Sequence, residues 1–263
     1  MIKLIASDVD DTLVPEGSVD LNPEYFEIIR ALQEKGIMFV AASGRQIHAI
    51  QKAFSPIKNE IAFIADNGTH ILTKDFEHSR DFGDENYMGL VKDFYSLKED
   101  CRFMACKPGQ SFINASTPDF VKMMSGFGFE ITPCEDIIDL KGIGKATLYH
   151  EFAVPKHIEK FFKEKWSDKM DVALAGKVFL DFSAKGANKG SALSLIQEHY
   201  GIKPEETMTF GNADNDIPMI RQSKYGYAVA QGSDKLKKEA YGVIGEMRDN
   251  AVLSKLKEVL NSL

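Results

Sequence analysis

The sequence predicts an α/β fold: a parallel-sheet domain into which a second, α+β domain is inserted. Two observations lead to this prediction. At both ends of the chain, short apolar runs alternate with helical patterns. This alternation is typical of a parallel sheet with right-handed crossovers. In the middle of the chain, this alternation is replaced by short strand candidates and separate helices. We therefore expect residues 1–83 and 186–263 to form the parallel-sheet domain and residues 84–185 to form the inserted domain.

The first third of the chain contains three apolar runs, at residues 3–7, 37–42 and 61–65. Each run ends at polar residues, as a buried strand does when a functional loop follows it. A helix is expected between the first two runs, because Asn22 can cap its start and Gly36 suits a left-handed end. These segments predict a strand–helix–strand unit followed by a further strand.

In the last third of the chain, predicted strands and helices alternate again. Residues 189–200 place apolar side chains on one helical face, and residues 217–222 and 251–260 also look helical. Short apolar runs at residues 207–210 and 226–230 read as strands. We expect these elements to complete the parallel sheet.

The middle of the chain has a different pattern. Helices are expected at residues 87–97, 118–127 and 155–166. Gly176 lies between two strand candidates and predicts a hairpin. The strand candidates are short apolar runs at residues 102–106, 111–114, 146–149, 170–174 and 177–182.

The composition is that of a globular protein with a sizeable core, since 44% of the 263 residues are hydrophobic and 27% are charged. No apolar run approaches the roughly 20 residues that span a bilayer, and the N-terminal apolar segment is too short for a signal peptide. We therefore expect a cytoplasmic protein with no membrane partner. The net charge of −7 and the lack of a basic tract argue against nucleic acid as a partner.

Cysteine and histidine give no sign of a zinc site or a disulfide framework. The chain has three cysteines, Cys101, Cys106 and Cys134, with no Cys-x-x-Cys pair, and its six histidines form no His-x-x-x-His pair. We expect the cysteines to be ordinary small side chains in or near the core.

Two acids, Asp8 and Asp10, directly follow the first apolar run. Buried carboxylates this close are costly unless they are paired, and a magnesium ion, which prefers oxygen ligands, would offset that cost. One carboxylate could attack phosphorus, and the other could protonate a leaving group and then deprotonate water. The alternative is an acidic turn whose side chains cap local N–H groups.

Three further clusters follow strand candidates or open helices. Ser43 and Gly44 could bind a phosphate oxygen through a hydroxyl and an N–H group. Lys189 could neutralise a carboxylate and a phosphoryl group. The loop at residues 211–216 is rich in acids and amides and could complete a magnesium shell. Each cluster has an ordinary alternative: a Ser-Gly turn, a solvated lysine and an Asx-rich helix cap.

Together the four clusters form an ordered pattern. The pattern reads Asp8-x-Asp10-x-Thr12-Leu13, Ser43-Gly44-Arg45, Lys189-Gly190 and Gly211-Asn212-x-x-Asn215-Asp216-x-x-Met219. It resembles the haloacid dehalogenase (HAD) superfamily over the whole chain, and the length of the insert resembles the Cof-type, class IIB sugar-phosphate phosphatases. The resemblance implies a Rossmann-like parallel-sheet HAD core with an inserted α+β cap domain.

The resemblance also implies a role for each matching residue. Asp8 would be the catalytic nucleophile and a magnesium ligand. Asp10 would be the general acid/base, with its backbone carbonyl as a second ligand. Ser43 and Gly44 would hold the phosphoryl group, and Lys189 would hold both that group and Asp8.

The fourth motif would supply the rest of the metal site. Asn212, Asn215 and Asp216 would provide magnesium ligands and their supports, and Asn215 would also approach the phosphoryl group. Arg45 would reach toward the substrate or the cap. Asn67-Gly68 matches a family loop near the active site and is expected to face the substrate.

One residue departs from the family pattern. The fourth motif usually begins with Gly-Asp, whereas this chain has Gly211-Asn212. An amide oxygen can bind magnesium, directly or through water, but it supplies no charge. We expect weaker magnesium binding unless Asp216 compensates. Asp214 adds an acid to the same loop.

The expected function is magnesium-dependent hydrolysis of small phosphomonoesters through an aspartyl-phosphate on Asp8. By resemblance, the partner is a small phosphorylated metabolite of the sugar-phosphate class. One alternative is a phosphotransferase or phosphomutase with the same chemistry. Another is a catalytically degenerate binding protein, which only Asn212 favours. A nucleotide-binding Rossmann protein is disfavoured, because no Gly-x-Gly-x-x-Gly follows the first apolar run. The sequence makes no prediction of oligomeric state.

Overall fold

The computed structural model describes residues 1–126 and 129–263. The chain divides into two compact units. The core unit comprises Met1–His78 and Asn188–Leu263, and the inserted unit comprises Ser79–Ala187. The chain thus leaves the core unit after residue 78 and returns to it at residue 188.

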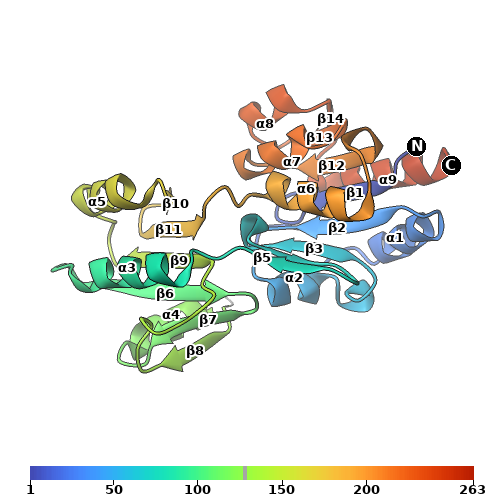
Figure 1. Cartoon of the computed structure of the whole chain (residues 1–263). Coiled ribbons are helices and arrows are strands. Elements are labelled where there is room, and N and C mark those ends of the chain that lie inside the picture. The colour runs from blue at the N-terminus through green and yellow to red at the C-terminus, as the bar shows by residue number, and fades with distance from the viewer. Residues whose placement is uncertain (127–128) are drawn as a thin grey trace. The chain divides into compact units, whose positions relative to one another are not determined.

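The core unit is built on a sheet of eight strands among the described residues, in the order β14-β13-β12-β1-β2-β3-β4-β5. Strand β1 lies between β12 and β2 and is parallel to both (Figure 1). The strands are β1 (Leu4–Asp8), β2 (Met38–Ala42), β3 (Ala62–Ala65), β4 (His70–Leu72), β5 (Glu77–Ser79), β12 (Thr207–Gly211), β13 (Tyr225–Val229) and β14 (Gly242–Ile244).

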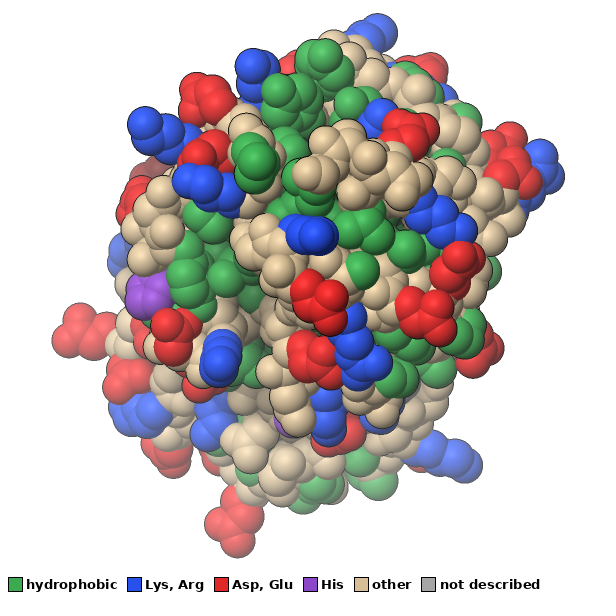
Figure 2. All heavy atoms as spheres, turned by 90° about the vertical axis from the view of Figure 1, so that its right-hand side faces the viewer, with side chains coloured by type: hydrophobic (Ala, Val, Ile, Leu, Met, Phe, Trp, Pro, Cys, Tyr) green, Lys and Arg blue, Asp and Glu red, His purple; other side chains and the backbone are tan. Residues whose placement is uncertain are grey.

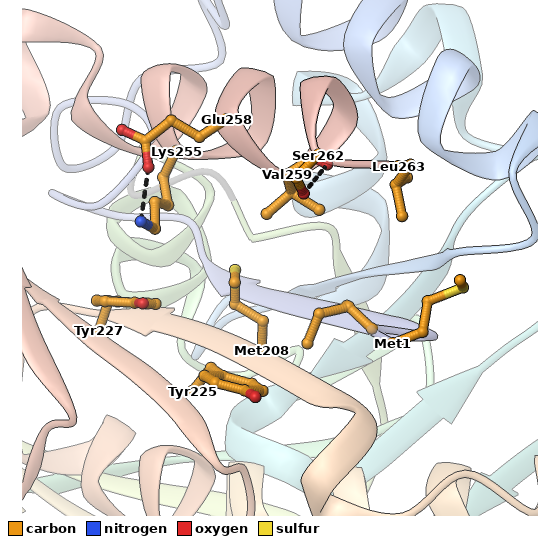
Figure 3. A pocket seen from close by; sticks show the side chains of 10 residues that line it. Met1, Met208, Tyr225, Tyr227, Lys255, Glu258, Val259, Ser262 and Leu263 are labelled. Carbon is orange, nitrogen blue, oxygen red and sulfur yellow. Dashed lines mark hydrogen bonds and ion pairs between the residues drawn. The ribbon is translucent and has the colours of Figure 1, made fainter.

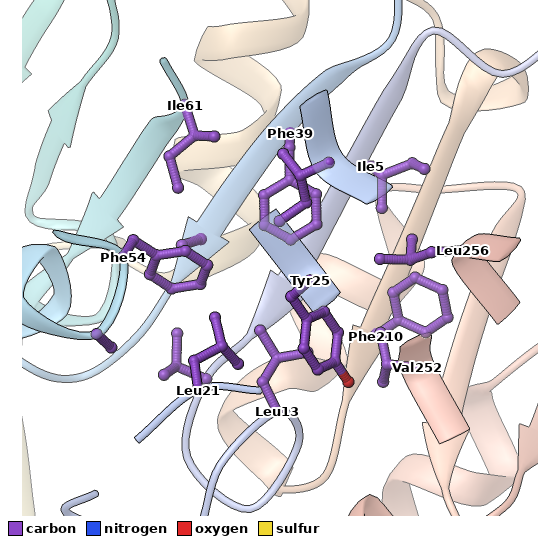
Figure 4. Close-up of a cluster of buried hydrophobic side chains, with 14 of the residues drawn as sticks. Ile5, Leu13, Leu21, Tyr25, Phe39, Phe54, Ile61, Phe210, Val252 and Leu256 are labelled. Carbon is purple, nitrogen blue, oxygen red and sulfur yellow. The ribbon is translucent and has the colours of Figure 1, made fainter. Parts of the chain in front are cut away.

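Both faces of this sheet are covered by helices, which explains why its strands read as continuous apolar runs. The helices are α1 (Glu24–Glu34), α2 (Ile47–Ala53), α6 (Lys189–Tyr200), α7 (Ile217–Arg221), α8 (Asp234–Glu239) and α9 (Ala251–Asn261). Successive side chains of a strand point to opposite faces. Ile5 accordingly packs in a cluster with α1, α2 and α9 (Figure 4), whereas Leu4 packs in a cluster with α6.

Tyr25 illustrates how the first helix is fixed. The N-cap residue of α1 is Pro23, one residue after the predicted Asn22, but the side chain of Asn22 accepts a hydrogen bond from the backbone N–H of Glu24, the first residue of the helix. Tyr25, one residue further, is 1% exposed, and its hydroxyl accepts a hydrogen bond from the backbone N–H of Leu253 in α9. Gly36, just after the helix, has a φ of 79°, the left-handed conformation expected of it.

The predicted α/β class is confirmed, but the sheet is not parallel throughout. Strand β4 runs antiparallel to β3. It has three residues and follows β3 after a short 3₁₀ turn at Asp66–Gly68, so it presents no apolar run long enough to predict a strand. Helices α2 and α8 and strands β5 and β14 were also not predicted, and each is seven residues or shorter.

The inserted unit is built on a second sheet, which has six strands among the described residues, in the order β10-β11-β9-β6-β7-β8. Helices α3 and α5 pack on one face of this sheet, and α4 packs on the other. The elements are α3 (Asp84–Tyr95), β6 (Cys101–Lys107), β7 (Gln110–Asn114), α4 (Pro118–Gly126), β8 (Ile131–Cys134), β9 (Lys145–His150), α5 (Lys156–Trp166), β10 (Met170–Ala175) and β11 (Phe179–Ala184).

Most of the pattern predicted for this segment is confirmed. Strands β10 and β11 form the antiparallel hairpin expected around Gly176, although β11 begins at Phe179, two residues later than expected. Strand β8 was not predicted. The helix predicted at residues 118–127 is α4, which ends at Gly126, and residue 127 lies outside the described residues.

A groove of about 530 Å³ lies at the end of the core unit where the two chain termini meet (Figure 3), on the side of the molecule that Figure 2 turns toward the viewer. Met208 and Tyr225, at the starts of β12 and β13, line it together with Lys255 and Glu258 of α9. The groove therefore lies at the amino ends of the strands, away from the carboxyl ends where the predicted site residues occur. No helix among the described residues combines the length and the apolar character needed to cross a bilayer.

Candidate active site

The four predicted clusters come together at the carboxyl ends of neighbouring core strands. Asp8 is the last residue of β1, Ser43 directly follows β2, and Asn212 directly follows β12. These strands are adjacent in the sheet, and the carboxyl ends of parallel strands are where α/β folds bind ligands. Lys189 is the first residue of α6, which packs on the same sheet.

Lys189 connects two buried carboxylates. Its Nζ lies 2.5 Å from Oδ1 of Asp8 and 2.6 Å from Oδ1 of Asp216. The three side chains are at most 5% exposed. Burial alone would lower the pKa of Lys189, but the two carboxylates raise it above its ordinary value. The lysine is therefore charged, and one positive charge serves two carboxylates.

The carboxyl group of Asp8 is held on both of its oxygens. Oδ1 accepts from Lys189, and Oδ2 accepts from the hydroxyl of Thr12 at 2.7 Å. Burial raises the pKa of Asp8 to about 7, against the opposing effect of Lys189 and with a further increase from Asp216. The main cause is burial, which disfavours the charged carboxylate, and Asp8 and Asp216 share the single positive charge of Lys189.

The side chain of Arg45 forms an ion pair with the carboxylate of Asp10. Nε of Arg45 lies 2.9 Å from Oδ2 of Asp10, and Nη2 lies 2.5 Å from Oδ1. The hydroxyl of Ser43 donates to Oδ2, and the backbone N–H of Gly17 donates to Oδ1. Burial acts to raise the pKa of Asp10, but these hydrogen bonds and the charge of Arg45 outweigh it, so the pKa lies below its ordinary value. The side chain of Arg45, expected to reach toward substrate or cap, here pairs with Asp10.

Asn67 lies directly over the phosphate-binding turn expected at Ser43 and Gly44. A Cβ atom on Gly44 would lie 3.1 Å from Nδ2 of Asn67, so a larger residue there would require the Asn67 side chain to shift by a few tenths of an ångström. Oδ1 of Asn67 accepts a hydrogen bond of 3.0 Å from Nδ2 of Asn215. Asn67 has a φ of 54°, a left-handed conformation that asparagine tolerates better than most residues. It thus links two loops of the candidate site.

Gly68 fits closely against the start of α6. It has a φ of 98°, and a Cβ atom there would lie 2.2 Å from the backbone oxygen of Asn188. Asn188 caps α6, since its side chain accepts from the backbone N–H of Ser191, and the hydroxyl of Ser191 accepts from the N–H of Asn188. The close packing of Gly68 therefore helps to set the position of Lys189.

Gly68→Ala should destabilise the protein more than Gly36→Ala. Both glycines have left-handed backbones, but a Cβ on Gly36 would meet nothing within 4 Å. Gly36→Ala should cost roughly 1–2 kcal/mol from backbone strain, and the clash at Gly68 should add about 1–3 kcal/mol. Urea unfolding of the two variants checks this difference. Equal losses in the free energy of unfolding would show that the close contact between Gly68 and Asn188 does not affect stability.

The fourth cluster is organised by Asp216. Its Oδ2 accepts from the backbone N–H groups of Asn212 and Ala213 at 2.9 and 3.0 Å, while its Oδ1 faces Lys189. Asp214 points elsewhere, because its carboxylate accepts from the hydroxyl of Ser233 and from Nζ of Lys235. The direction of the Asp214 side chain could not be predicted from the sequence. In the structure its carboxylate faces Ser233 and Lys235, away from the candidate metal ligands.

The residues expected to bind magnesium fit a hard cation. All the donors proposed for it are oxygens: the carboxylate of Asp8, the backbone carbonyl of Asp10 and side chains of the fourth motif. The excess negative charge on Asp8 is also what a cation would relieve. In the part of the chain that the structure describes, however, no three acidic, histidine or cysteine side chains are grouped to hold a metal. Amide and main-chain oxygens would therefore have to contribute.

Comparison with known proteins identifies the family of this chain. A family model described as haloacid dehalogenase-like hydrolase matches residues 5–256. The chain belongs to the haloacid dehalogenase-like hydrolases. The predicted family and enzyme class are thereby confirmed.

Several relatives of this HAD-like hydrolase match along nearly their whole length. A crystal structure from Eubacterium rectale is 33% identical with a TM-score of 0.92, and the match covers 98% of this chain and 99% of that one. The 5-amino-6-(5-phospho-D-ribitylamino)uracil phosphatase of Escherichia coli is 24% identical over 98% of this chain and 96% of its own. A HAD subclass IIB sugar phosphatase, 22% identical, has the same fold, with a TM-score of 0.77 over 98% of both chains.

Two residues to which no role was assigned, Thr12 and Gly17, contact the predicted site residues of this HAD-like hydrolase. Thr12 was quoted as part of the first motif without a role, and its hydroxyl holds Asp8. Its position four residues after Asp8 is the signal that could have suggested this bond. The backbone N–H of Gly17 donates to Asp10, and no side-chain pattern could have pointed to it.

Proposed function

We propose that this HAD-like hydrolase is a magnesium-dependent phosphatase that cleaves small phosphomonoesters, with sugar phosphates as the substrate class, through an aspartyl-phosphate on Asp8. The observation that carries the proposal is the buried carboxylate of Asp8, held by Lys189 and Thr12 at the end of the central strand. The names of relatives support the reaction type, since the E. coli relative is named a phosphatase of a phosphorylated ribitylaminouracil.

The reaction has two steps. A carboxylate oxygen of Asp8 attacks phosphorus, the ester P–O bond breaks, and the leaving oxygen takes a proton from Asp10. Water then gives a proton to Asp10 and attacks the same phosphorus, which releases inorganic phosphate and frees Asp8. Arg45 must withdraw from at least one oxygen of Asp10 before the first step, because Asp10 cannot donate a proton while every contact to it is a donor.

The phosphoryl group would lie among four hydrogen-bond donors of the core unit. The hydroxyl of Ser43, the N–H of Gly44, Nζ of Lys189 and the amide of Asn215 are the donors in question. They suit the negative charge of the equatorial oxygens, whose stabilisation accounts for most of the catalysis of phosphoryl transfer. Magnesium, when bound, supplies positive charge that neutralises Asp8 and the phosphoryl oxygens.

The inserted unit would act as the cap of this enzyme. It has its own sheet and its own apolar core. In this role it would exclude bulk water and select the leaving group.

An assay with p-nitrophenyl phosphate tests the proposal. We expect release of nitrophenol that requires magnesium, stops when EDTA is added and returns when excess magnesium is restored. Hydrolysis that EDTA leaves unchanged would contradict the metal dependence. No release at any enzyme concentration, with or without metal, would favour a binding protein. A panel of sugar phosphates then separates release of phosphate from its transfer to a second sugar.

A further inference from the structure

One short loop of the core unit contacts both the first cluster, which begins at Asp8, and the fourth cluster, residues 211–216. This loop, residues 230–233, follows β13 and precedes α8, and we call it the linking loop. We propose that the linking loop fixes the two clusters relative to each other and that its Gln231 is a positioning residue for the reaction on Asp8. The inference rests on the proposed function for its kinetic test only.

The side chain of Gln231 joins the first cluster to the 3₁₀ turn before α9. Its Nε2 donates to the backbone carbonyl of Asp11 at 2.7 Å, and its Oε1 accepts from the backbone N–H of Met247 at 3.2 Å. A carbonyl can only accept and an N–H can only donate, so the two contacts fix the orientation of the amide. Both contacts together require a side chain that donates at one atom and accepts at the other.

Asp11 lies in the turn that directly follows the two acids of the first cluster. It has a φ of 53°, and its N–H donates to the backbone oxygen of Val14 at 2.7 Å. Because Gln231 holds its carbonyl, the planar peptide groups on both sides of Asp11 are held. The second of these groups leads to Thr12, whose hydroxyl donates to Oδ2 of Asp8. A shift of the Asp11 carbonyl would therefore displace a donor to the nucleophile.

The other end of the linking loop packs on the fourth cluster. The backbone N–H of Ser233 donates to the carbonyl of Asn212 at 2.7 Å, and its hydroxyl donates to Asp214 at 2.7 Å. Gly232 lies so close that a Cβ atom there would be 2.8 Å from the backbone oxygen of Asn212. The N–H of Asn212 in turn donates to the buried carboxylate of Asp216. The linking loop thus supports the segment that holds Asp216.

Regular structure holds both ends of the linking loop. The N–H of Ala230, directly after β13, donates to the backbone oxygen of Gly245, directly after β14, at 3.1 Å. Ser233 caps α8, since its side chain accepts from the backbone N–H of Leu236. A loop that is held at both ends and contacts both clusters keeps them at one spacing.

Loss of the Gln231 contact should affect the reaction more than the stability of the fold. Gln231 is exposed, and water replaces an exposed hydrogen bond at little cost. The reaction is more sensitive, since a displacement of about 1 Å in a reacting group can lower a rate about 100-fold. Ser43 and Lys189, expected to bind the phosphoryl group, come from other segments, so KM should change less than kcat.

Steady-state hydrolysis of p-nitrophenyl phosphate by Gln231→Leu tests the inference. Leucine is uncharged and similar in size, and its side chain neither donates nor accepts. We expect kcat to fall about 10-fold while KM stays within about twofold of the wild type. Gln33→Leu is the matched control, because Nε2 of Gln33 also donates to a backbone carbonyl, that of Glu60, at the amino ends of the strands. Its kcat and KM should equal those of the wild type.

Gln231→Glu separates the donor from other properties of the side chain. Glutamate can still accept from Met247, but its carboxylate has no N–H group for the carbonyl of Asp11. This variant should lose as much kcat as Gln231→Leu. A loss in Gln231→Glu that is absent in Gln231→Leu would come from the added charge and would contradict the inference.

Hydrogen exchange gives a second readout that needs no activity. Mass spectrometry of peptides that cover residues 9–17 should show exchange about fivefold faster in Gln231→Leu than in the wild type. Gln33→Leu should leave exchange in this segment unchanged.

Two results would overturn the inference: a Gln231→Leu enzyme with the kcat of the wild type, or one in which residues 9–17 exchange at the wild-type rate. If either occurs while the wild type hydrolyses p-nitrophenyl phosphate, only this inference fails. If the wild type hydrolyses nothing, the proposed function fails, and the exchange rates still decide whether Gln231 holds the loop.

Discussion

Asp8→Asn should lower kcat for phosphomonoester hydrolysis by about four orders of magnitude or more. An amide oxygen is a poor nucleophile and forms no stable phosphoryl ester, so the first step has no acceptor. The change is nearly isosteric: the remaining oxygen can still accept from Lys189, and the new amide N–H can donate to the hydroxyl oxygen of Thr12. Because it also removes part of the excess buried charge, the variant should fold at least as stably as the wild type.

Steady-state assays with p-nitrophenyl phosphate, together with thermal unfolding, check both parts of this expectation. Asp11→Asn is a matched control in the same loop. Asp11 has a left-handed backbone, which asparagine also adopts, and its Oδ1 accepts from the backbone N–H of Glu16, which an amide oxygen can also do. The control should stay within a few-fold of the wild type. An Asp8→Asn enzyme that keeps activity within tenfold of the wild type would rule out the covalent mechanism.

Lys189→Met should destabilise the metal-free protein by about 3–5 kcal/mol, in addition to abolishing activity. The substitution leaves the carboxylates of Asp8 and Asp216 buried beside each other without a cation, and removal of one partner from a buried ion pair typically costs this much. Urea unfolding in EDTA measures the effect. Lys235→Met, which removes an exposed lysine from its pair with Asp214, should change stability little.

A double variant separates loss of charge balance from loss of packing. Lys189→Met combined with Asp216→Asn removes one of the two uncompensated charges, and the amide oxygen can still accept from the backbone of the loop. The double variant should therefore regain part of the stability that Lys189→Met loses. If it is less stable than Lys189→Met by the full cost of the second substitution, charge balance is not the reason for the loss.

Much of the candidate site follows from position along the strands. Asp8, Ser43 and Asn212 each come after an apolar run, and parallel strands that are neighbours bring such residues to one edge. What could not be predicted are contacts made by long side chains. Arg45 reaches Asp10 across 35 residues of sequence, and Asp214 turns to Lys235 rather than to the site. The spacing and periodicity of the sequence do not indicate the direction of either side chain.

The same limit explains the fold predictions. The helix beginning at Lys189 was predicted with its observed bounds, because its apolar positions recur over twelve residues. Strand β4 was missed because three residues carry no periodicity, and its antiparallel direction depends on the turn at Asp66 and Asn67, where both residues have positive φ. Short elements are specified by turns and by tertiary packing rather than by pattern.

The capping of α6 has a consequence for how this enzyme could be re-engineered. The chain re-enters the core unit at Asn188, and the next residue is Lys189. Asn188, Ser191 and Gly68 fix that re-entry point with contacts that all belong to the core unit. Residues 79–187 could accordingly be exchanged for the equivalent segment of a relative, as a cassette, without displacing the lysine. If the inserted unit selects the leaving group as proposed, this exchange would transfer substrate specificity, while the charge arrangement around Lys189 stays with the host.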